Sequence, residues 1–126
     1  MDPEAIRDMF EAFGPVQVRR MFGGHGIYRD GVMFALESEG ELYLKADGEG
    51  MARLQDLGSR PFSYRTKDGR TTIISFWLMP ESALDDRDEA AELARMAVQA
   101  ALRAKASKGT KAKKPAQRRK SASELI

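Results

Sequence analysis

The sequence predicts an α+β fold, a two-layer sandwich with helices packed on an antiparallel sheet of five to six strands. Apolar residues recur every three to four positions in three segments, a spacing typical of amphipathic helices. In the segments between, they recur at every second position, as in strands. Tight turns such as Asp30-Gly31 join successive strands, and such short connections make neighbouring strands antiparallel. The expected order is α-β-β-β-β-α-β-β-α around one core.

The first helix has signals at both ends. Asp2 supplies a side-chain acceptor for the first turn, and Pro3 suits the first helical position. Gly14-Pro15 ends the helix, because glycine adopts the left-handed conformation and proline cannot continue. The residues between them on one apolar stripe are Ile6, Met9, Phe10 and Phe13.

Four strands are then expected, beginning at Val16 and continuing at 27–29, 32–37 and 41–46. A period of two places Val32, Phe34 and Leu36 on one face of the third strand. Asp30-Gly31 and a turn at 39–40 connect these strands as a meander.

The second half adds a short helix, two strands and a long helix. Asp47 caps the short helix, which ends at Gly58. Strands at 62–65 and 71–79 flank a turn at Lys67-Asp68-Gly69, with Phe76 on one face and Trp77 on the other. Asp86, with Glu89 three residues later, begins the last helix, which is expected to end at about Ala104. On the second of these strands, Ile74 and Leu78 share the face of Phe76.

Size and charge divide the chain into a domain and a tail. The 126 residues suit one domain, and with no cysteine there are neither disulfides nor cysteine-based zinc sites. From Lys105 onward, eight Lys or Arg stand against one Glu, a net charge of +7, so residues 1–104 carry −5. We expect a folded domain over 1–104 and a disordered polybasic tail over 105–126, because the tail lacks the apolar residues that offset the entropy of ordering.

Two motifs carry a family resemblance. The run from Arg19 to Ala35, with Arg-Met-Phe-Gly-Gly at 20–24, and Leu-Tyr-Leu-Lys at 42–45 resemble the signature of the TfoX (Sxy) N-terminal domain family. The segments at 58–64 and 76–80 occupy the places of that family's G-x-x-P-F-x-Y and aromatic-x-x-P elements. The resemblance covers residues 4–104, the whole predicted domain.

The resemblance implies a small antiparallel sheet with helices on it, related to secretion-chaperone-like folds. The family's namesake is a bacterial regulator of natural competence with a second, helical C-terminal domain, and this chain has the basic tail in its place. The resemblance supplies no catalytic residues.

The run Gly23-Gly24-His25-Gly26 has two interpretations. Its backbone N–H groups can form an anion-binding nest beside Arg19 and Arg20, although no Walker A motif is present. The simpler interpretation is a turn or bulge that glycine permits. His25 is the only histidine. Since neither a nucleophile nor further metal ligands accompany it in a known pattern, we expect an exposed loop residue without a catalytic or metal-binding role.

The strands offer a candidate binding face. Arg19, Arg20 and Lys45, together with Tyr43 and Tyr28, can line a surface for a partner or an anion. The alternative is an outward-facing surface on which these cations pair across strands with Glu37, Glu39 or Glu41. Trp77 and Tyr64 would add an apolar interface if their face of the sheet is uncovered.

The tail is a polybasic segment of the kind that binds the phosphates of nucleic acids without sequence specificity. The alternative is an arm that only keeps the protein soluble. With no aromatic residue, the tail lacks stacking platforms for single strands. The candidate contacts are Lys111, Lys113, Lys114, Arg118, Arg119 and Lys120.

We therefore expect a cytoplasmic, non-enzymatic interaction module, without metal or cofactor, that binds a protein partner or a second copy of itself. The acidic start at Met1 and Asp2 has no apolar segment after it, which argues against export, and no apolar run is long enough to cross a membrane. Association with nucleic acid through the tail is the alternative. An enzyme or binder of a phosphorylated ligand at the Gly23–Gly26 run is least favoured.

Overall fold

The computed structural model describes residues 1–21, 23–65 and 71–113, without the side chains of 64, 65, 71–74 and 107–113. The predicted order of elements is present, with one short helix added before the last. The elements are α1 (Pro3–Met9), β1 (Gln17–Met21), β2 (Gly24–Arg29), β3 (Val32–Ser38), β4 (Glu41–Lys45), α2 (Gly48–Asp56), β5 (Pro61–Arg65), β6 (Thr71–Leu78), α3 (Glu81–Leu84) and α4 (Arg87–Lys113).

The strands form one antiparallel sheet in the order β1-β2-β3-β4-β6-β5. The first four follow the chain as the predicted meander, while β6 lies between β4 and β5, so β1 and β5 are the edges. Asp30 and Gly31 have φ angles of 52° and 80°, the left-handed conformation that this two-residue hairpin turn requires. The predicted antiparallel α+β sandwich is confirmed.

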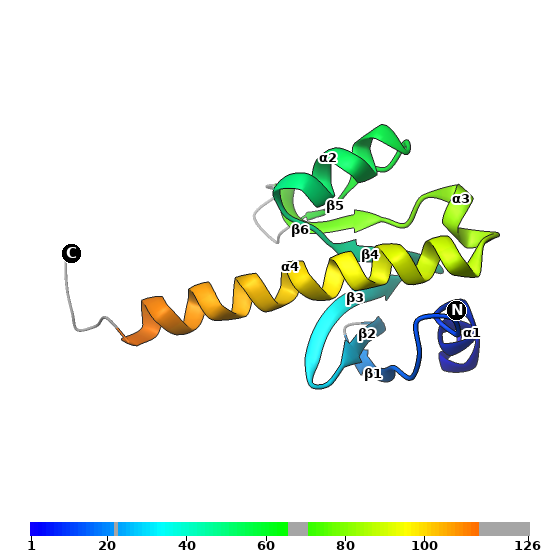
Figure 1. Cartoon of the computed structure of the whole chain (residues 1–126), viewed down its shortest axis with the longest axis horizontal. Coiled ribbons are helices and arrows are strands. Elements are labelled where there is room, and N and C mark those ends of the chain that lie inside the picture. Colours follow the sequence, from blue (N-terminus) through cyan, green and yellow to red (C-terminus); the bar gives the residue numbers. More distant parts are fainter. Residues whose placement is uncertain (22, 66–70, 114–126) are drawn as a thin grey trace.

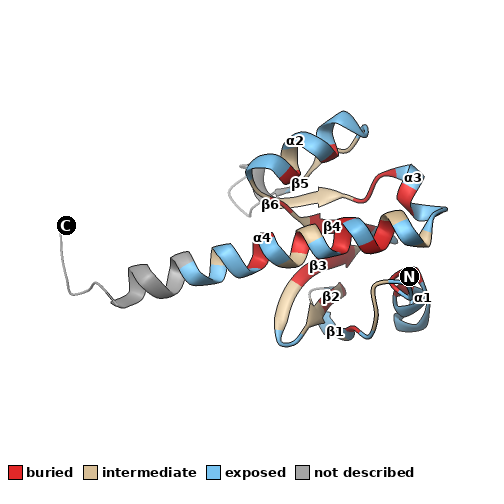
Figure 2. Ribbon diagram, in the orientation of Figure 1, coloured by how far each residue is buried: buried red, intermediate tan, exposed pale blue. Residues whose placement is uncertain are grey.

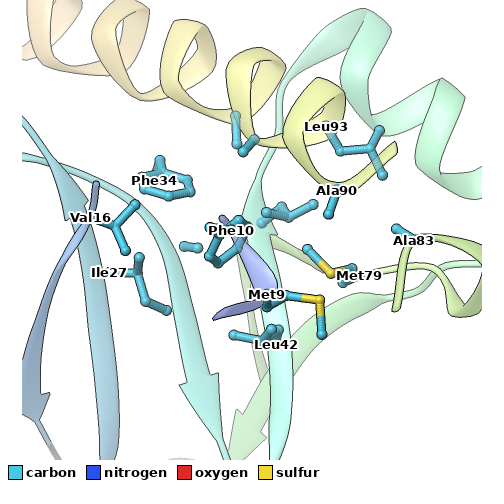
Figure 3. Packing of buried hydrophobic residues seen from close by; sticks show 14 of the residues in the cluster. Met9, Phe10, Val16, Ile27, Phe34, Leu42, Met79, Ala83, Ala90 and Leu93 are labelled. Carbon is cyan, nitrogen blue, oxygen red and sulfur yellow. The ribbon is translucent and has the colours of Figure 1, made fainter. Parts of the chain in front are cut away.

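The helices gather on one face of this sheet. Helix α4 crosses that face, with α1 near its N-terminal end and α2 alongside (Figure 1). A buried stripe on α4 faces the strands, whereas its outer side is exposed (Figure 2). Phe10, which caps the C-terminus of α1, lies between the sheet and α4, with Phe34 on the strand side and Leu93 on the helix side (Figure 3). The rings of Phe10 and Phe34 meet edge to face at 5.4 Å.

A β-bulge interrupts the alternation of β3. Ile27 lies opposite Ala35, but the next residue, Tyr28, lies opposite Met33, so Phe34 is an extra residue on β3. Phe34 and Ala35 both join the core with no exposed surface, whereas Leu36 lies on the other face. The prediction that Val32, Phe34 and Leu36 share one face is therefore wrong, because the bulge shifts the register between them.

Two of the three predicted N-cap residues make the side-chain hydrogen bond of a helix cap. Asp2 accepts a hydrogen bond from the Ala5 N–H at 2.8 Å, and Asp86 Oδ1 accepts from the Asp88 and Glu89 N–H groups at 3.0 and 3.2 Å. Asp47 stands at the N-cap of α2 but makes no side-chain cap bond. Its carboxylate instead accepts two hydrogen bonds from Arg103 of α4, both at 2.8 Å, which hold the pKa of Asp47 below its usual range.

Helix α4 continues to Lys113, beyond its predicted end at about Ala104, so residues 105–113 are helical where disorder was expected. This part of α4 projects away from the sheet (Figure 1). The remainder of the predicted tail, 114–126, and the predicted turn at 67–69 lie outside the described residues.

Candidate interaction surface

The face of the sheet opposite the helices carries no helix of the described chain (Figure 1). We call it the open face. Tyr43 of β4 lies on it opposite Leu78 and Leu36 in the strand register, and its ring packs edge to face against Phe62 of β5 at 4.7 Å. None of these four side chains belongs to the core cluster between sheet and helices. They form a second apolar cluster in which Phe62 and Leu78 are half-buried.

The polar end of Tyr43 is also fixed. Its hydroxyl donates to Glu41 Oε1 at 3.0 Å, an oxygen that also lies 3.5 Å from the Arg60 guanidinium. Burial, followed by the contact with Glu41, raises the pKa of Tyr43, so the phenol stays protonated as a donor. The ring of Tyr43 is consequently held in one position on the open face.

Two cations of the open face lie over aromatic rings. The Arg19 guanidinium is 5.0 Å from the centre of the Tyr28 ring, and Lys45 Nζ is 5.3 Å from that of Phe76. Lys45 Nζ also donates to Ser75 Oγ at 2.7 Å. Attraction between a cation and a ring face holds each charge above an apolar surface. The open face therefore offers positive charge beside aromatic surface at two separate places.

Gly26 lies on the open face beneath three larger side chains. A Cβ at this position would lie 2.9 Å from Met21 Sδ and 3.1 Å from Tyr28 Cε1, and Met33 Sδ lies 3.4 Å away. These three side chains close over the glycine. Methionine side chains are flexible and adapt to differently shaped partners.

The glycine run contains the predicted turn, at Gly23, and continues as the beginning of a strand. Gly23 has a φ of 80°, but Gly24 to Gly26 belong to β2. At Gly24 a Cβ would come within 2.0 Å of the Glu37 carbonyl oxygen. Glycine is therefore required there by the close approach of β2 and β3. Anion binding by this run stays a prediction.

His25 is paired with a buried carboxylate instead of standing exposed in a loop. Its Nδ1 lies 2.6 Å from Glu37 Oε1, while Glu37 Oε2 accepts from the Gly40 N–H at 2.8 Å and lies 3.6 Å from the N-terminal amine. Burial alone would raise the pKa of Glu37, but the bonds from His25 and Gly40 and the nearby positive charge hold it below its usual value. Glu37, predicted as a surface partner of the strand cations, thus stabilises the junction of β2, β3 and the following turn.

The structure divides the predicted binding residues between the two faces. Tyr43, Lys45 and Arg19 lie on the open face, although β2 and β3 separate Arg19 from the other two. Arg20 lies opposite His25, so its side chain is directed to the helix-covered side, where it is exposed. The predicted binding residues therefore do not form one site. The side chain of Tyr64 and those of the predicted tail contacts lie outside the described residues.

Trp77 also lies on the helix-covered side, opposite Leu44, and packs against the core cluster. It is not part of the open face; Phe76 is. Sequence reasoning selected neither Phe62 nor Phe76 for this surface. The sequence does place Phe76 on the same face of its strand as Leu78, because the two residues are two positions apart. It does not indicate which face of the sheet the helices cover, since that depends on contacts between distant segments.

The described residues contain no group of three or more His, Asp or Glu side chains arranged to hold a metal ion. In the same residues, no helix has the length and apolar character needed to cross a membrane. What the geometry defines is a small α+β domain with one helix-covered face and one open face of aromatic, methionine and cationic side chains.

Comparison with known proteins assigns this domain to a family. The model of the TfoX N-terminal domain matches residues 8–101, and the chain belongs to that family. It is 31% identical over 99 residues to DNA transformation protein TfoX1 of Aliivibrio fischeri, a match that covers 74% of this chain and 47% of the relative. It is 25% identical over 105 residues to protein Sxy of Escherichia coli, covering 83% and 50%. The chain thus spans about half the length of these relatives.

Proposed function

We propose that this protein is a non-enzymatic regulatory module, related in role to the DNA transformation protein it resembles, which acts by binding a protein partner through the open face. The observation that carries the proposal is a sheet face that bears no helix of the described chain. On this face Tyr43 packs against Phe62, Lys45 lies over Phe76, and Arg19 lies over Tyr28. Aromatic, methionine and arginine side chains are the residues enriched at protein interfaces.

The chemistry of the domain supports binding over catalysis. Its lone histidine is held by Glu37, whose Oε1 lies 2.6 Å from the histidine Nδ1. A general base needs a group to deprotonate within hydrogen-bond reach. Gly24 to Gly26 also lie in a strand, where backbone N–H groups are used for pairing with neighbouring strands. Few of these N–H groups therefore remain to bind an anion. A phosphorylated ligand at this run is the least favoured role.

Two adjacent arginines test the proposal. Arg19→Glu reverses a charge on the open face, and Arg20→Glu makes the same change one residue later on the other face. We expect the first substitution to reduce partner capture from a cell extract at least tenfold and the second to leave it unchanged. Equal capture by both variants would contradict binding through the open face.

The role in DNA transformation is tested in the bacterium that carries the gene. A deletion strain should lose transformation frequency, and the wild-type gene should restore it. The Arg19→Glu variant should restore much less than Arg20→Glu. Unchanged frequency in the deletion strain would contradict a role in transformation while leaving the binding proposal to the capture experiment.

A second candidate function is association with nucleic acid or another polyanion. It is favoured by the continuation of α4 to Lys113 in a stretch where no Asp or Glu occurs between Glu92 and Glu124. A helix places basic residues along a rod that projects from the domain, and such a rod can follow a line of phosphates.

A further inference from the structure

The described part of the chain exposes four large hydrophobic side chains, and three of them line one groove. Met1, Leu57 and Leu84 are 40%, 40% and 36% exposed, and all border an open groove of about 570 Å³. The end of α2, the end of β6 and α3 form its walls. A groove that gathers most of the exposed apolar side chains of a small domain marks an interaction site.

The rim of this groove is acidic. Glu41 and Glu81 line it, and Asp56 and Asp85 adjoin Leu57 and Leu84 in the chain. The cationic groups of the groove residues are the Arg60 guanidinium and the N-terminal amine of Met1. They already lie 3.5 Å from Glu41 and 3.6 Å from Glu37. The groove therefore suits an apolar side chain that is surrounded by positive charge.

The fourth exposed hydrophobic side chain has these properties. Leu102 of α4 is 42% exposed, and the charged residues near it in the helix are Arg95, Arg103 and Lys105. Because Arg103 is already paired with Asp47, Arg95 and Lys105 supply the positive charge for a partner. No carboxylate follows Glu92 along the described part of α4. Leu102 is thus an exposed apolar residue on a basic segment of α4, directly before the part of the helix that projects from the sheet.

A chain cannot place Leu102 in its own groove. The groove lies at the N-terminal end of α4, next to Leu84, and α4 begins at Arg87. At 1.5 Å per residue, the helix carries Leu102 about 22 Å away along its axis. Only a second copy can therefore join the two surfaces.

We propose that copies of this protein associate head to tail, with Leu102 and its basic neighbours on one copy bound in the acidic groove between Leu57 and Leu84 of the next. The occupant of the groove is a second copy of this chain. The contact is heterologous, since each copy contributes a different surface to each of two junctions, and such contacts produce open chains or rings. The groove borders the open face at Leu78 and Glu41. Its apolar anchors, Leu57 and Leu84, lie outside that face, so variants at these two positions and at Arg19 test the two proposals separately.

Two charge-introducing variants of the full chain test the interface. Leu102→Glu removes the apolar side chain and keeps the groove, whereas Leu84→Glu damages the groove and keeps Leu102. In sedimentation experiments at low salt, the wild-type chain should show a mass that rises with concentration well above 14.0 kDa. Each variant alone should remain a monomer. Mixed in equal amounts, they should form a dimer of twice that mass and nothing larger, because only one intact junction is available.

Gln99→Glu is the matched control for the added charge on α4, and Leu84→Met retains an apolar residue in the groove. Leu84→Met should associate as the wild type does. Gln99→Glu should associate more weakly than the wild type, because it lowers the positive charge, but more strongly than Leu102→Glu, because it keeps the apolar side chain. Circular dichroism should show that all variants are folded. Higher salt should weaken the association, because exposed charges are screened. A wild-type chain that stays monomeric, variants that associate normally, a mixture that stays monomeric, or association only after nucleic acid is added would each overturn the proposal.

Discussion

His25 Nδ1 lies 2.6 Å from Glu37 Oε1. This contact joins β2 to β3 near the end of β3, just before the turn to β4. The carboxylate is 5% exposed and is held by the Gly40 N–H as well. Removal of one partner from a buried hydrogen-bonded charge leaves the other without compensation.

Glu37→Gln should therefore lower the free energy of unfolding by about 1–3 kcal/mol at neutral pH. The control is Glu39→Gln, an exposed position two residues later, where we expect a change within about 0.5 kcal/mol. Urea unfolding followed by circular dichroism measures both. Equal effects of the two substitutions would show that the His25–Glu37 contact contributes no stability.

The same contact predicts a pH dependence. Because the pKa of Glu37 in the folded state lies below its ordinary value of 4.5, the stabilisation is complete above that value and is lost as the pH falls through the folded-state pKa. The difference in stability between wild type and Glu37→Gln should shrink as the pH falls below 4.5. A difference that grows on acidification would contradict the assignment.

Three glycines allow substitutions with opposite results. Gly24→Ala should destabilise by about 3 kcal/mol or more, because the new Cβ would lie 2.0 Å from a backbone carbonyl oxygen that cannot move away. Gly50→Ala in α2 should stabilise by about 0.5–1 kcal/mol, because its Cβ would meet Met96 and Ala46 at 3.6 and 3.7 Å, ordinary contact distances. Gly26→Ala, which meets flexible methionine side chains, should fall between. Thermal unfolding ranks the three variants, and the reverse order would refute the packing argument.

Sequence reasoning succeeded where the cause is local. The cap at Asp2, the turn at Asp30-Gly31 and the start of α4 after Asp86 each depend on residues within a few positions. The antiparallel meander follows from short connections alone. Helix α3 was missed because four residues are too few for a helical period to show. Helix α4 extends further than expected because an established helix adds residues at little cost, whatever their charge.

The candidate surface depended on distant contacts and was only partly predictable. The bulge at Phe34 decides which β3 side chains face the helices, and no turn or composition signal accompanies it. The pairing of His25 with Glu37 joins two strands whose register is set by that bulge. Lys45 and Tyr43 were identified correctly as neighbours on one strand, but the separation of Arg19 from Arg20 requires knowledge of which face the helices cover.

Loss of the basic segment tests nucleic-acid association. A chain ending at Ala104 should retain cooperative unfolding, because the core residues of α4 end before that point, and it should lose binding to double-stranded DNA. For the full chain, the affinity should fall steeply between about 50 mM and 200 mM salt, with a logarithmic slope of about −0.9 for each phosphate neutralised. Binding that survives truncation would place the contact in the domain instead.

Site-specific photocrosslinking tests the central claim, binding through the open face, most directly. A benzophenone side chain is introduced in place of Arg19, on the open face, or of Arg20, directed to the helix-covered side on the same strand. In cells, the probe at position 19 should crosslink a discrete partner protein that the probe at position 20 does not reach. Crosslinking of the same partner from position 20 alone, or equally from both positions, would contradict binding through the open face.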